Sequence, residues 1–348
     1  MKIDEISSQT KDQAKGPIKG LGLCSGGLDS ILSALLLQRQ GIDVTWICFE
    51  TPFFSSESAQ KASLLTGIPL ITIDITDDYM EMMKNPKAGF GKNMNPCMDC
   101  HALMFSKAGE VLKNKDFHFL FSGEVLGQRP KSQNKNSLRY VEKNSGFEGR
   151  ILRPLCAKLL PATLVEQNGL VNREKLLDIS GRSRKIQMQM ARDFGIKEYP
   201  APAGGCLLTD KIFSDRLQDL MNTQKKFNKR ELYYLKYGRH FRLDQKTKVI
   251  VGRSEDDNKH LLRYCNIDKD ILLRHARMPG PDVILTGSFT PNNIQTAAMI
   301  CAAYTKSNPG KTADIRILKR KNENIITVKT IKASEFKQLM LPPPLSLV

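Results

Sequence analysis

The chain has 348 residues, and its 53 Lys and Arg residues outnumber its 36 Asp and Glu residues to give a formal net charge of +17. No apolar run reaches the roughly 18 residues that a membrane helix needs, and residues 1–16 lack the apolar core of a signal peptide. We therefore expect a cytoplasmic protein with no membrane partner, in which the eight cysteines are reduced. The length and the hydrophobic content of 41 % allow two packed domains.

The first two hundred residues alternate between short apolar runs and amphipathic runs. The apolar runs predict strands and the amphipathic runs predict helices, so this part has the pattern of an α/β fold with a parallel sheet covered by helices on both faces. The predicted strands are 18–23, 44–49, 70–75, 117–123 and 151–155, and the predicted helices are 31–37, 55–65, 102–112 and 184–194. Ligands of such sheets bind beyond the carboxyl ends of the strands, where Ser25, Phe49 and Gly123 are expected to lie.

A glycine-rich turn, Cys24-Ser25-Gly26-Gly27-Leu28-Asp29-Ser30, separates the first predicted strand from the first predicted helix. Such a turn can aim backbone N–H groups at an anion, and the helix N-terminus adds its positive dipole end. Gly26 and Gly27 permit a positive φ and a close backbone approach. Asp29 adds a possible metal or phosphate ligand, and Ser30 adds a hydroxyl donor. The turn predicts a phosphate site, and the alternative is an ordinary strand-to-helix turn with serine capping.

This string resembles the PP-loop of the ATP pyrophosphatase superfamily, whose members split ATP between the α and β phosphates to adenylate a substrate. It lacks the Lys-Ser/Thr ending of a Walker loop and the glycine spacing of a dinucleotide-binding loop. The resemblance implies ATP and Mg²⁺ as cofactors, with Asp29 as a metal ligand. Phe49 could cover the adenine ring, although an aromatic residue at a strand end is as often part of the core.

A second motif, Asn95-Pro96-Cys97-Met98-Asp99-Cys100-His101, places two sulfur atoms close together. This spacing suits a metal, a dithiol or a persulfide relay, and because no second such pair occurs we do not expect a closed four-cysteine zinc site. Cys206 differs from the remaining cysteines because it follows Gly204-Gly205 in a stretch rich in helix and strand breakers. The remaining five cysteines are expected to be buried as small hydrophobic residues.

Asn-Pro-Cys-x-x-Cys after a PP-loop resembles the tRNA thiouridine synthetases, which replace a uridine carbonyl oxygen with sulfur. The segments 127–133 and 152–155 resemble the Gly-Gln-x-x-Ser-Gln and Leu-Arg-Pro-Leu segments of the 4-thiouridine synthetases. The resemblance covers about residues 17–210 and implies tRNA as a partner, with Gly123 and Gln128 helping to bind the nucleotide. The Asn-Pro-Cys string instead matches the 2-thiouridine branch, and neither a rhodanese-like domain nor an N-terminal tRNA-binding domain is expected, so the modified base stays open.

The resemblance leaves two versions of the sulfur chemistry. In one, a persulfide on Cys97 or Cys206 attacks the adenylated base and the other cysteine resolves it as a disulfide. In the other, Cys97, Cys100 and Cys206 hold a [4Fe-4S] cluster with one iron open to sulfide, and three cysteines favour this version. His101 could be a fourth ligand, but helix capping is the favoured role. The sequence identifies neither the sulfur donor (a cysteine desulfurase, a persulfide carrier or sulfide) nor the oligomeric state.

From about residue 238 the sequence changes to short alternating apolar runs with a single helical pattern at 293–305, which predicts a small α+β domain. Net positive charge is denser in this part than before it, which indicates a polyanion partner. The segments 251–258 and 274–285 resemble signature segments of the NFACT-type RNA-binding domain. The resemblance implies contacts to the RNA backbone, for which the candidate residues are Arg274, His275, Arg277, Lys311, Lys319 and Arg320.

Together these motifs predict an ATP-dependent tRNA sulfurtransferase with Cys97, Cys206 and Asp29 as catalytic residues. The alternative is a nucleotide-sensing protein that binds RNA or a ribosome without thiolation, which gives no reason for three convergent thiols. A PP-loop ligase acting on a small carboxylate would leave both the cysteine pair and the basic domain unexplained. The expected segments are a flexible N-terminus (1–16), a PP-loop domain (17–212), a helical connector (213–237), an NFACT-like domain (238–338) and a tail (339–348).

Overall fold

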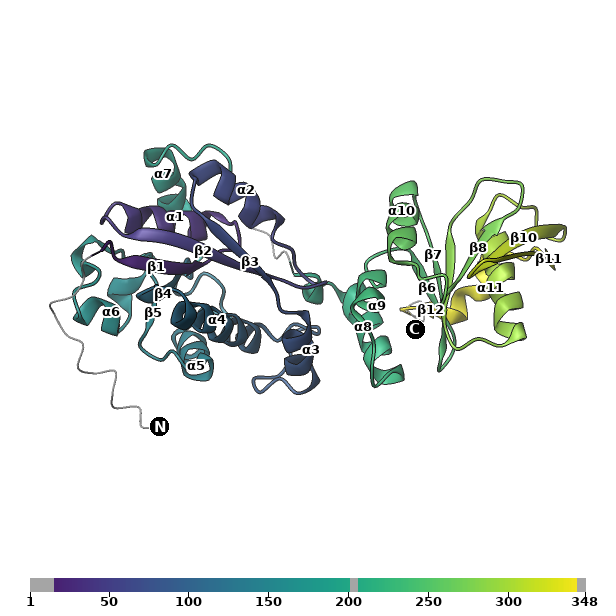
Figure 1. Ribbon diagram of the computed structural model, residues 1–348, viewed down its shortest axis with the longest axis horizontal. Coiled ribbons are helices and arrows are strands. Elements are labelled where there is room, and N and C mark those ends of the chain that lie inside the picture. The colour runs from purple at the N-terminus through teal and green to yellow at the C-terminus, as the bar shows by residue number, and fades with distance from the viewer. Residues whose placement is uncertain (1–15, 201–205, 343–348) are drawn as a thin grey trace. The chain divides into compact units, whose positions relative to one another are not determined.

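The computed structural model describes residues 16–200 and 206–342 and divides the chain into two compact units, Met1–Cys206 and Leu207–Val348 (Figure 1). The expected flexible N-terminus, the Gly204-Gly205 pair and the end of the expected tail lie outside the described residues. Among the described helices, none is long and apolar enough to cross a membrane.

The first unit contains a five-stranded parallel sheet, which confirms the predicted α/β fold. Its strands follow the order β3-β2-β1-β4-β5, so the chain adds strands on one side of β1 and then returns to add strands on the other. The bounds are β1 (Lys19–Leu23), β2 (Asp43–Glu50), β3 (Leu70–Asp74), β4 (Phe119–Ser122) and β5 (Ile151–Leu152). The strand order reverses between β1 and β4, and ligands of such sheets bind at the carboxyl ends of the strands beside this point.

Helices cover both faces of this sheet (Figure 1). One face carries α1 (Leu28–Gln38), α2 (Glu57–Thr66) and α7 (Lys185–Asp193), and the other carries α4 (Cys97–Asn114) and α5 (Lys135–Ser145). Shorter elements connect them: α3 (Thr76–Lys84), α6 (Leu164–Gln167), and the 3₁₀ turns η2 (Ala157–Leu159) and η3 (Arg173–Lys175). Because both faces are covered, the middle of the sheet is apolar, and Trp46 in β2 is fully buried, whereas the edge strand β3 contains no fully buried residue.

The second unit contains a seven-stranded antiparallel sheet with helices, which confirms the predicted α+β class. Its strand order is β11-β10-β8-β9-β7-β6-β12. The strands are β6 (Arg239–Asp244), β7 (Thr247–Val251), β8 (Ile271–His275), β9 (Val283–Gly287), β10 (Thr312–Lys319), β11 (Asn322–Lys329) and β12 (Met340–Leu341).

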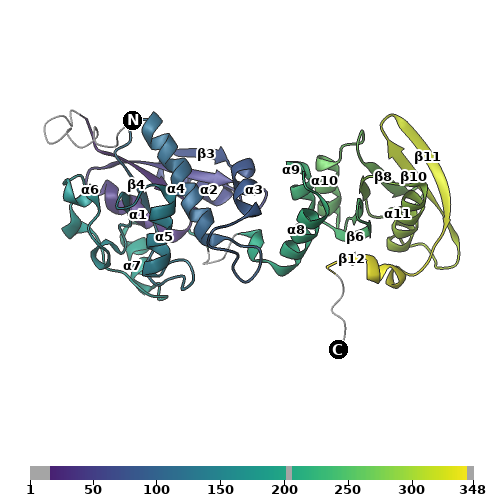
Figure 2. The ribbon, with the colours of Figure 1, turned by 90° about the horizontal axis from the view of Figure 1, so that it is seen from below.

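One long helix, α11 (Pro291–Tyr304), packs against this sheet and closes the larger of the two hydrophobic clusters found among the described residues of this unit (Figure 2). The smaller cluster joins the sheet to α9 (Lys229–Tyr234) and α10 (Glu255–Tyr264). Helix α8 (Lys211–Thr223) and the 3₁₀ turns η4 (Leu207–Thr209) and η5 (Ala333–Leu339) complete the unit. The stretch for which the sequence predicts a helical connector thus contains α8 and α9.

Gly109 in the middle of α4 offers a test of packing against helix propensity. A methyl group at this position would overlap the ring of Phe147 on the neighbouring segment. Helix propensity alone favours Gly109→Ala by about 1 kcal/mol, whereas overpacking of this kind costs about 1–3 kcal/mol. We expect net destabilisation of the first unit, measured by urea unfolding with the fluorescence of Trp46, the single tryptophan of the chain. In a Phe147→Leu background the same substitution should cost less, and a Gly109→Ala protein more stable than wild type would contradict this packing.

Candidate active site

The predicted glycine-rich turn joins β1 to α1 and runs close to the start of α2. Gly26 has a φ of 73°, and a side chain there would overlap the backbone of Ser58. The N–H of Cys24 donates to the carbonyl of Ile47 at 2.9 Å, which extends the alignment of β1 and β2 into the turn. Position 26 needs a positive φ and has no room for a side chain, and only glycine meets both conditions. The turn therefore keeps a fixed backbone path.

The first turn of α1 leaves backbone donors available to a ligand. Gly27 precedes the helix, and no side chain caps it, so the alternative of an ordinary serine-capped turn does not describe this helix. The Ser30 hydroxyl is buried and donates to the Gly27 carbonyl at 2.7 Å, and the exposed Ser25 hydroxyl accepts from the Gly27 N–H at 3.4 Å. The two serines therefore brace the turn, while the uncapped N–H groups can meet an anion.

A buried polar chain begins at Asp29, in this first turn. The Gln128 amide donates to Asp29 Oδ2 at 2.5 Å, and the Gln187 amide donates to Gln128 Oε1 at 3.0 Å. A side chain at Gly123 would overlap the backbone of Asp29, so the end of β4 lies directly against this turn. The fold therefore brings Asp29, Gly123 and Gln128 together.

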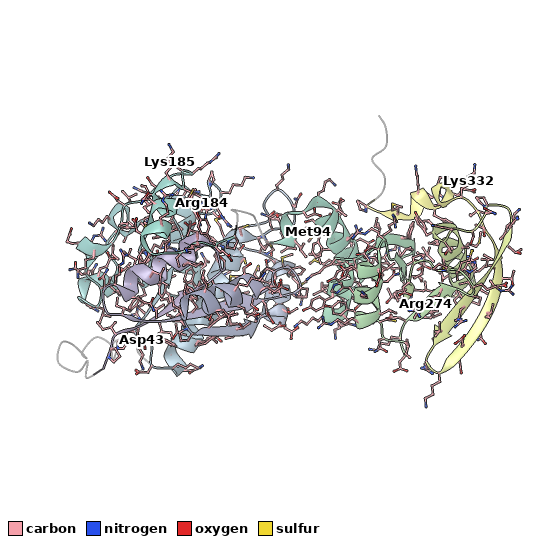
Figure 3. The ribbon with its side chains drawn as sticks, turned by 90° about the horizontal axis from the view of Figure 1, so that it is seen from above. Asp43, Met94, Arg184, Lys185, Arg274 and Lys332 are labelled. Atoms are coloured by element: carbon pink, nitrogen blue, oxygen red, sulfur yellow. The ribbon has the colours of Figure 1, made fainter. Side chains whose placement is uncertain are left out.

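Three buried atoms of this region have no hydrogen-bond partner among the described residues: Asp29 Oδ1, Gln187 Oε1 and Arg184 Nε. Burial raises the pKa of Asp29, although Gln128 and Arg184 act in the opposite direction. Unsatisfied buried polar atoms are rare in folded proteins and often mark a ligand site. A carboxylate and an amide oxygen fit a divalent cation, and a guanidinium fits a phosphate, so these residues fit Mg²⁺ and a nucleotide. Arg184 lies just before α7 (Figure 3), and no motif in the sequence indicated it or Gln187.

The three cysteines of the predicted sulfur site approach one another in the first unit. Cys97 begins α4, Cys100 is buried one turn later, and Cys97 and Cys206 are half-buried. Burial raises the pKa of the Cys100 thiol, and the nearby Cys206 and Cys97 raise it further. The nearby Tyr79 hydroxyl acts in the opposite direction on the pKa of Cys100, and the Asn95 amide donates to Cys97 Sγ at 3.3 Å.

The donor set fits an iron–sulfur cluster in kind, because three thiols converge and one iron would stay open. Within residues 16–200 and 206–342, however, no group of three Cys, His, Asp or Glu side chains is arranged closely enough to hold a metal ion. All eight cysteines are thiols. Among the described residues, the three thiols therefore lie near one another but without the close spacing of metal ligands.

A buried ion-pair network lies beside the sulfur site. Arg153 donates to Glu124 Oε2 at 2.9 Å and also pairs with Glu142, while His101 Nδ1 lies 2.9 Å from Glu124 Oε1. Burial alone would raise the pKa of Glu124, but Arg153 and His101 outweigh it and hold the pKa at about 2. The expected helix-capping role of His101 is therefore wrong: Pro96 precedes α4, no side chain caps the helix, and the imidazole contacts Glu124 instead.

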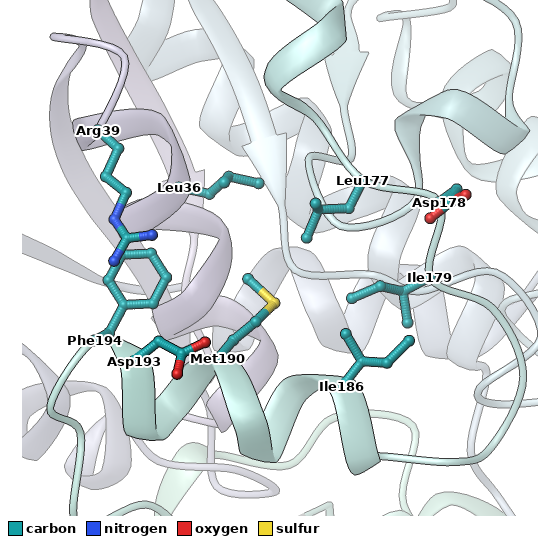
Figure 4. A pocket seen from close by; sticks show the side chains of 9 residues that line it. All are labelled: Leu36, Arg39, Leu177, Asp178, Ile179, Ile186, Met190, Asp193 and Phe194. Atoms are coloured by element: carbon teal, nitrogen blue, oxygen red, sulfur yellow. The ribbon is translucent and has the colours of Figure 1, made fainter.

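Phe49, the candidate cover for an adenine ring, is only 3 % exposed. A separate pocket of about 240 Å³ opens between the C-terminal part of α1 and α7 (Figure 4). Its lining is mostly apolar, and the guanidinium of Arg39 lies 3.7 Å from the centre of the Phe194 ring. Because no residue of the glycine-rich turn or of the cysteine group lines it, this pocket is not the candidate active site.

The candidate RNA-binding residues lie in the second unit and differ in their contacts. Arg274 (Figure 3) pairs with Asp282, and Arg277 pairs with Asp314 at 3.6 Å. His275 Nδ1 accepts backbone N–H groups of the loop that follows β8. Three exposed cations, by contrast, pair with no carboxylate among the described residues: Lys311, Lys319 and Arg320.

Comparison with known proteins assigns both units. Residues 17–158 match the family model described as thiamine biosynthesis protein (ThiI), and residues 238–340 match the model of the NFACT protein RNA binding domain. The first unit therefore contains a PP-loop domain of the ThiI type. The second contains an NFACT-type RNA-binding domain, so the chain combines the two domains that its motifs predict.

Curated relatives match the PP-loop part. A tRNA-specific 2-thiouridylase MnmA 1 of Fusobacterium nucleatum is 30 % identical over 180 residues, which is 50 % of this chain and 45 % of that protein. A probable tRNA sulfurtransferase of Acholeplasma laidlawii is 30 % identical over 168 residues, 46 % of this chain and 38 % of that protein. The chain thus spans less than half the length of these relatives. A solved 4-thiouridine synthetase–RNA complex with bound ATP is 18 % identical, with 51 % of each chain covered and a TM-score of 0.32.

The depressed pKa of Glu124 predicts a specific pH dependence of stability. Its ionised form stabilises the fold fully above its ordinary pKa of 4.5, and this stabilisation is lost as the pH falls towards about 2. We expect Glu124→Gln to lower the free energy of unfolding at pH 7 by a few kcal/mol. The variant should also lose less stability than wild type between pH 4.5 and 2, measured by urea unfolding with Trp46 fluorescence.

Glu148→Gln is the matched control, because Glu148 is exposed and its nearest cation, Arg139, is 3.9 Å away. This control should follow the wild-type pH curve. If the free energy of unfolding fell equally with pH in Glu124→Gln and in wild type, the buried ion pair would not be the cause of the loss of stability at acid pH.

Proposed function

We propose that the protein is an ATP-dependent tRNA sulfurtransferase of the cytoplasm that adenylates a uridine carbonyl oxygen and replaces it with sulfur. The observation that carries the proposal is the joint presence, in one unit, of a braced phosphate loop and three convergent thiols. The His101–Glu124 contact ties the second turn of α4 to the residue after Gly123, which supports a common location of both features at the carboxyl edge of the sheet. The names of the curated relatives and the RNA-binding domain support the same activity.

The proposed first step uses the loop and its polar chain. The uncapped N–H groups of α1 would bind the phosphates of ATP, and Arg184 would balance their charge. Mg²⁺, held by Asp29 Oδ1, would neutralise the phosphate oxygens. The uridine oxygen then bonds to the α-phosphorus and pyrophosphate leaves, after which sulfur bonds to the base carbon and AMP leaves.

For the second step we propose that Cys97, Cys100 and Cys206 are the ligands of a [4Fe-4S] cluster, which supplies an iron position open to sulfide. The burial of Cys100 supports a ligand role, since a buried thiol with a raised pKa is a poor nucleophile until a metal deprotonates it. Cys97 and Cys206 are half-buried and would form the pair in a persulfide relay. The sulfur donor would be a cysteine desulfurase, a persulfide carrier or sulfide.

The sulfur chemistry is tested on protein purified without oxygen. We expect a brown protein with about four irons per chain that thiolates tRNA with ATP and sulfide, measured by mass spectrometry of nucleosides. Cys100→Ser should lose the iron and the activity, whereas the control Cys265→Ser, in the second unit, should keep both. Full thiolation by Cys100→Ser without iron would exclude the cluster and favour the relay. Binding of ATP and tRNA without any thiolation would favour a nucleotide-sensing RNA-binding protein instead.

Asp29→Asn tests the first step, because it keeps the shape of the side chain and removes the charge. We expect the rate of tRNA-dependent pyrophosphate release to fall by about 100-fold or more, since the cation would lose its ligand. Binding of tRNA should not change. The matched control is Asp43→Asn, at the start of β2 and thus at the opposite edge of the sheet (Figure 3), which should retain wild-type activity. An active Asp29→Asn enzyme would remove Asp29 from the mechanism.

A further inference from the structure

A cavity of about 520 Å³ opens in the second unit between α11 and the tip of the β10–β11 hairpin. These elements lie side by side in Figures 1 and 2. Four isoleucines form the apolar part of its lining: Ile271 of β8, Ile294 of α11, and Ile317 and Ile326 of the hairpin. The hairpin extends beyond the surface that α11 covers, so Ile317 and Ile326 are only half-buried.

Two asparagines continue this side of the hairpin towards its tip. Asn322 and Asn324 alternate with outward-facing residues of β11, so they lie on the same side as Ile326. Both are exposed, and neither side-chain amide has a hydrogen-bond partner among the described residues. Asparagine is disfavoured in strands, so two at successive positions of one face need a reason other than strand formation.

Two cations, Lys319 and Arg320, form the rim at the hairpin turn. Arg320 has a φ of 55°, and its N–H donates to the Ile267 carbonyl at 2.8 Å, which fixes the turn in a conformation that arginine rarely adopts. The Lys319 ammonium lies 4.7 Å from the centre of the Phe289 ring. No residue of the lining is acidic, and the Glu323 carboxylate, from the other side of the strand, pairs with Arg316 at 3.1 Å. The rim therefore complements an anion.

We propose that this pocket binds one unpaired nucleotide of RNA. The isoleucines would contact the face of the base, the amides of Asn322 and Asn324 would bind its edge, and Lys319 and Arg320 would bind its phosphate. The cavity is in the size range of small-ligand pockets. A base inside a duplex cannot enter, because stacking and pairing hold it. This proposal rests on the proposed function only for the identity of the RNA as tRNA. The pocket would add a preference for unpaired bases to the contacts with the RNA backbone.

The test compares the full chain with its Asn322→Ala/Asn324→Ala variant by filter binding at physiological salt. The probes are a single-stranded RNA dodecamer, a duplex of the same sequence, tRNA and free UMP. We expect the variant to bind the single strand about tenfold more weakly and the duplex as wild type does, with an unchanged dependence on salt. Lys319→Ala should weaken binding of both RNAs and reduce the salt slope by about one.

Ile325→Ala is the matched control, because it removes an exposed side chain from the opposite side of the same strand. It should bind all probes as wild type does. Unchanged affinity of the double variant for the single strand overturns the proposal, and so does a loss confined to free UMP, which would assign the pocket to a free nucleotide. A tenfold loss for single-stranded RNA in a protein that does not thiolate tRNA would support the pocket while refuting the proposed function.

Discussion

The buried pairing of Arg153 with Glu124 is the interaction on which the arrangement of the first unit depends. Arg153 is 1 % exposed, and its partners come from the end of β4 and from α5. Glu124 also contacts His101 in the second turn of α4. An isolated buried charge is costly, so each group holds the others in place. Because the proposed sulfur site begins at Cys97 and the proposed nucleotide site abuts Gly123, this single pairing fixes the two sites relative to each other.

Close backbone packing also holds the elements of the nucleotide site in fixed positions. Gly26 and Gly123 leave no room for a side chain against Ser58 and Asp29, respectively. The start of α2, the first turn of α1 and the end of β4 therefore meet without intervening side chains. Rigid positioning of this kind favours chemistry in which charge develops at a fixed point, as it does when pyrophosphate leaves ATP. Asp29 Oδ1 has no hydrogen-bond partner among the described residues, and a bound cation would offset the energetic cost of burying it.

Local signals in the sequence predicted much of this arrangement. The alternating runs predicted the parallel sheet, which the structure confirms, and the glycine and cysteine motifs indicated the two candidate sites, because these features depend on residues close together in the chain. The sequence did not reveal the roles of Gln187, Arg184 or Glu124, which meet their partners only through the fold. His101 shows the limit best: its place beside Cys100 suggested a cap or a ligand, and the true partner, Glu124, lies 23 residues away. Asn322 and Asn324 also carry no motif, since only the hairpin places them beside the apolar cavity.

The charged residues of the two units differ in burial, and this difference suits the proposed reaction. The pairs around Glu124 and Arg153 are buried, so salt screens them weakly, and the site keeps its geometry at any physiological ionic strength. The exposed cations of the second unit would bind the RNA backbone in the proposed function, and such binding falls steeply as salt rises. In the proposed enzyme, mutations could therefore change affinity for RNA without changing the chemistry at the base. If unpaired bases also enter the hairpin pocket, the second unit contributes a selection among RNAs that charge alone cannot provide, because every RNA carries the same phosphates.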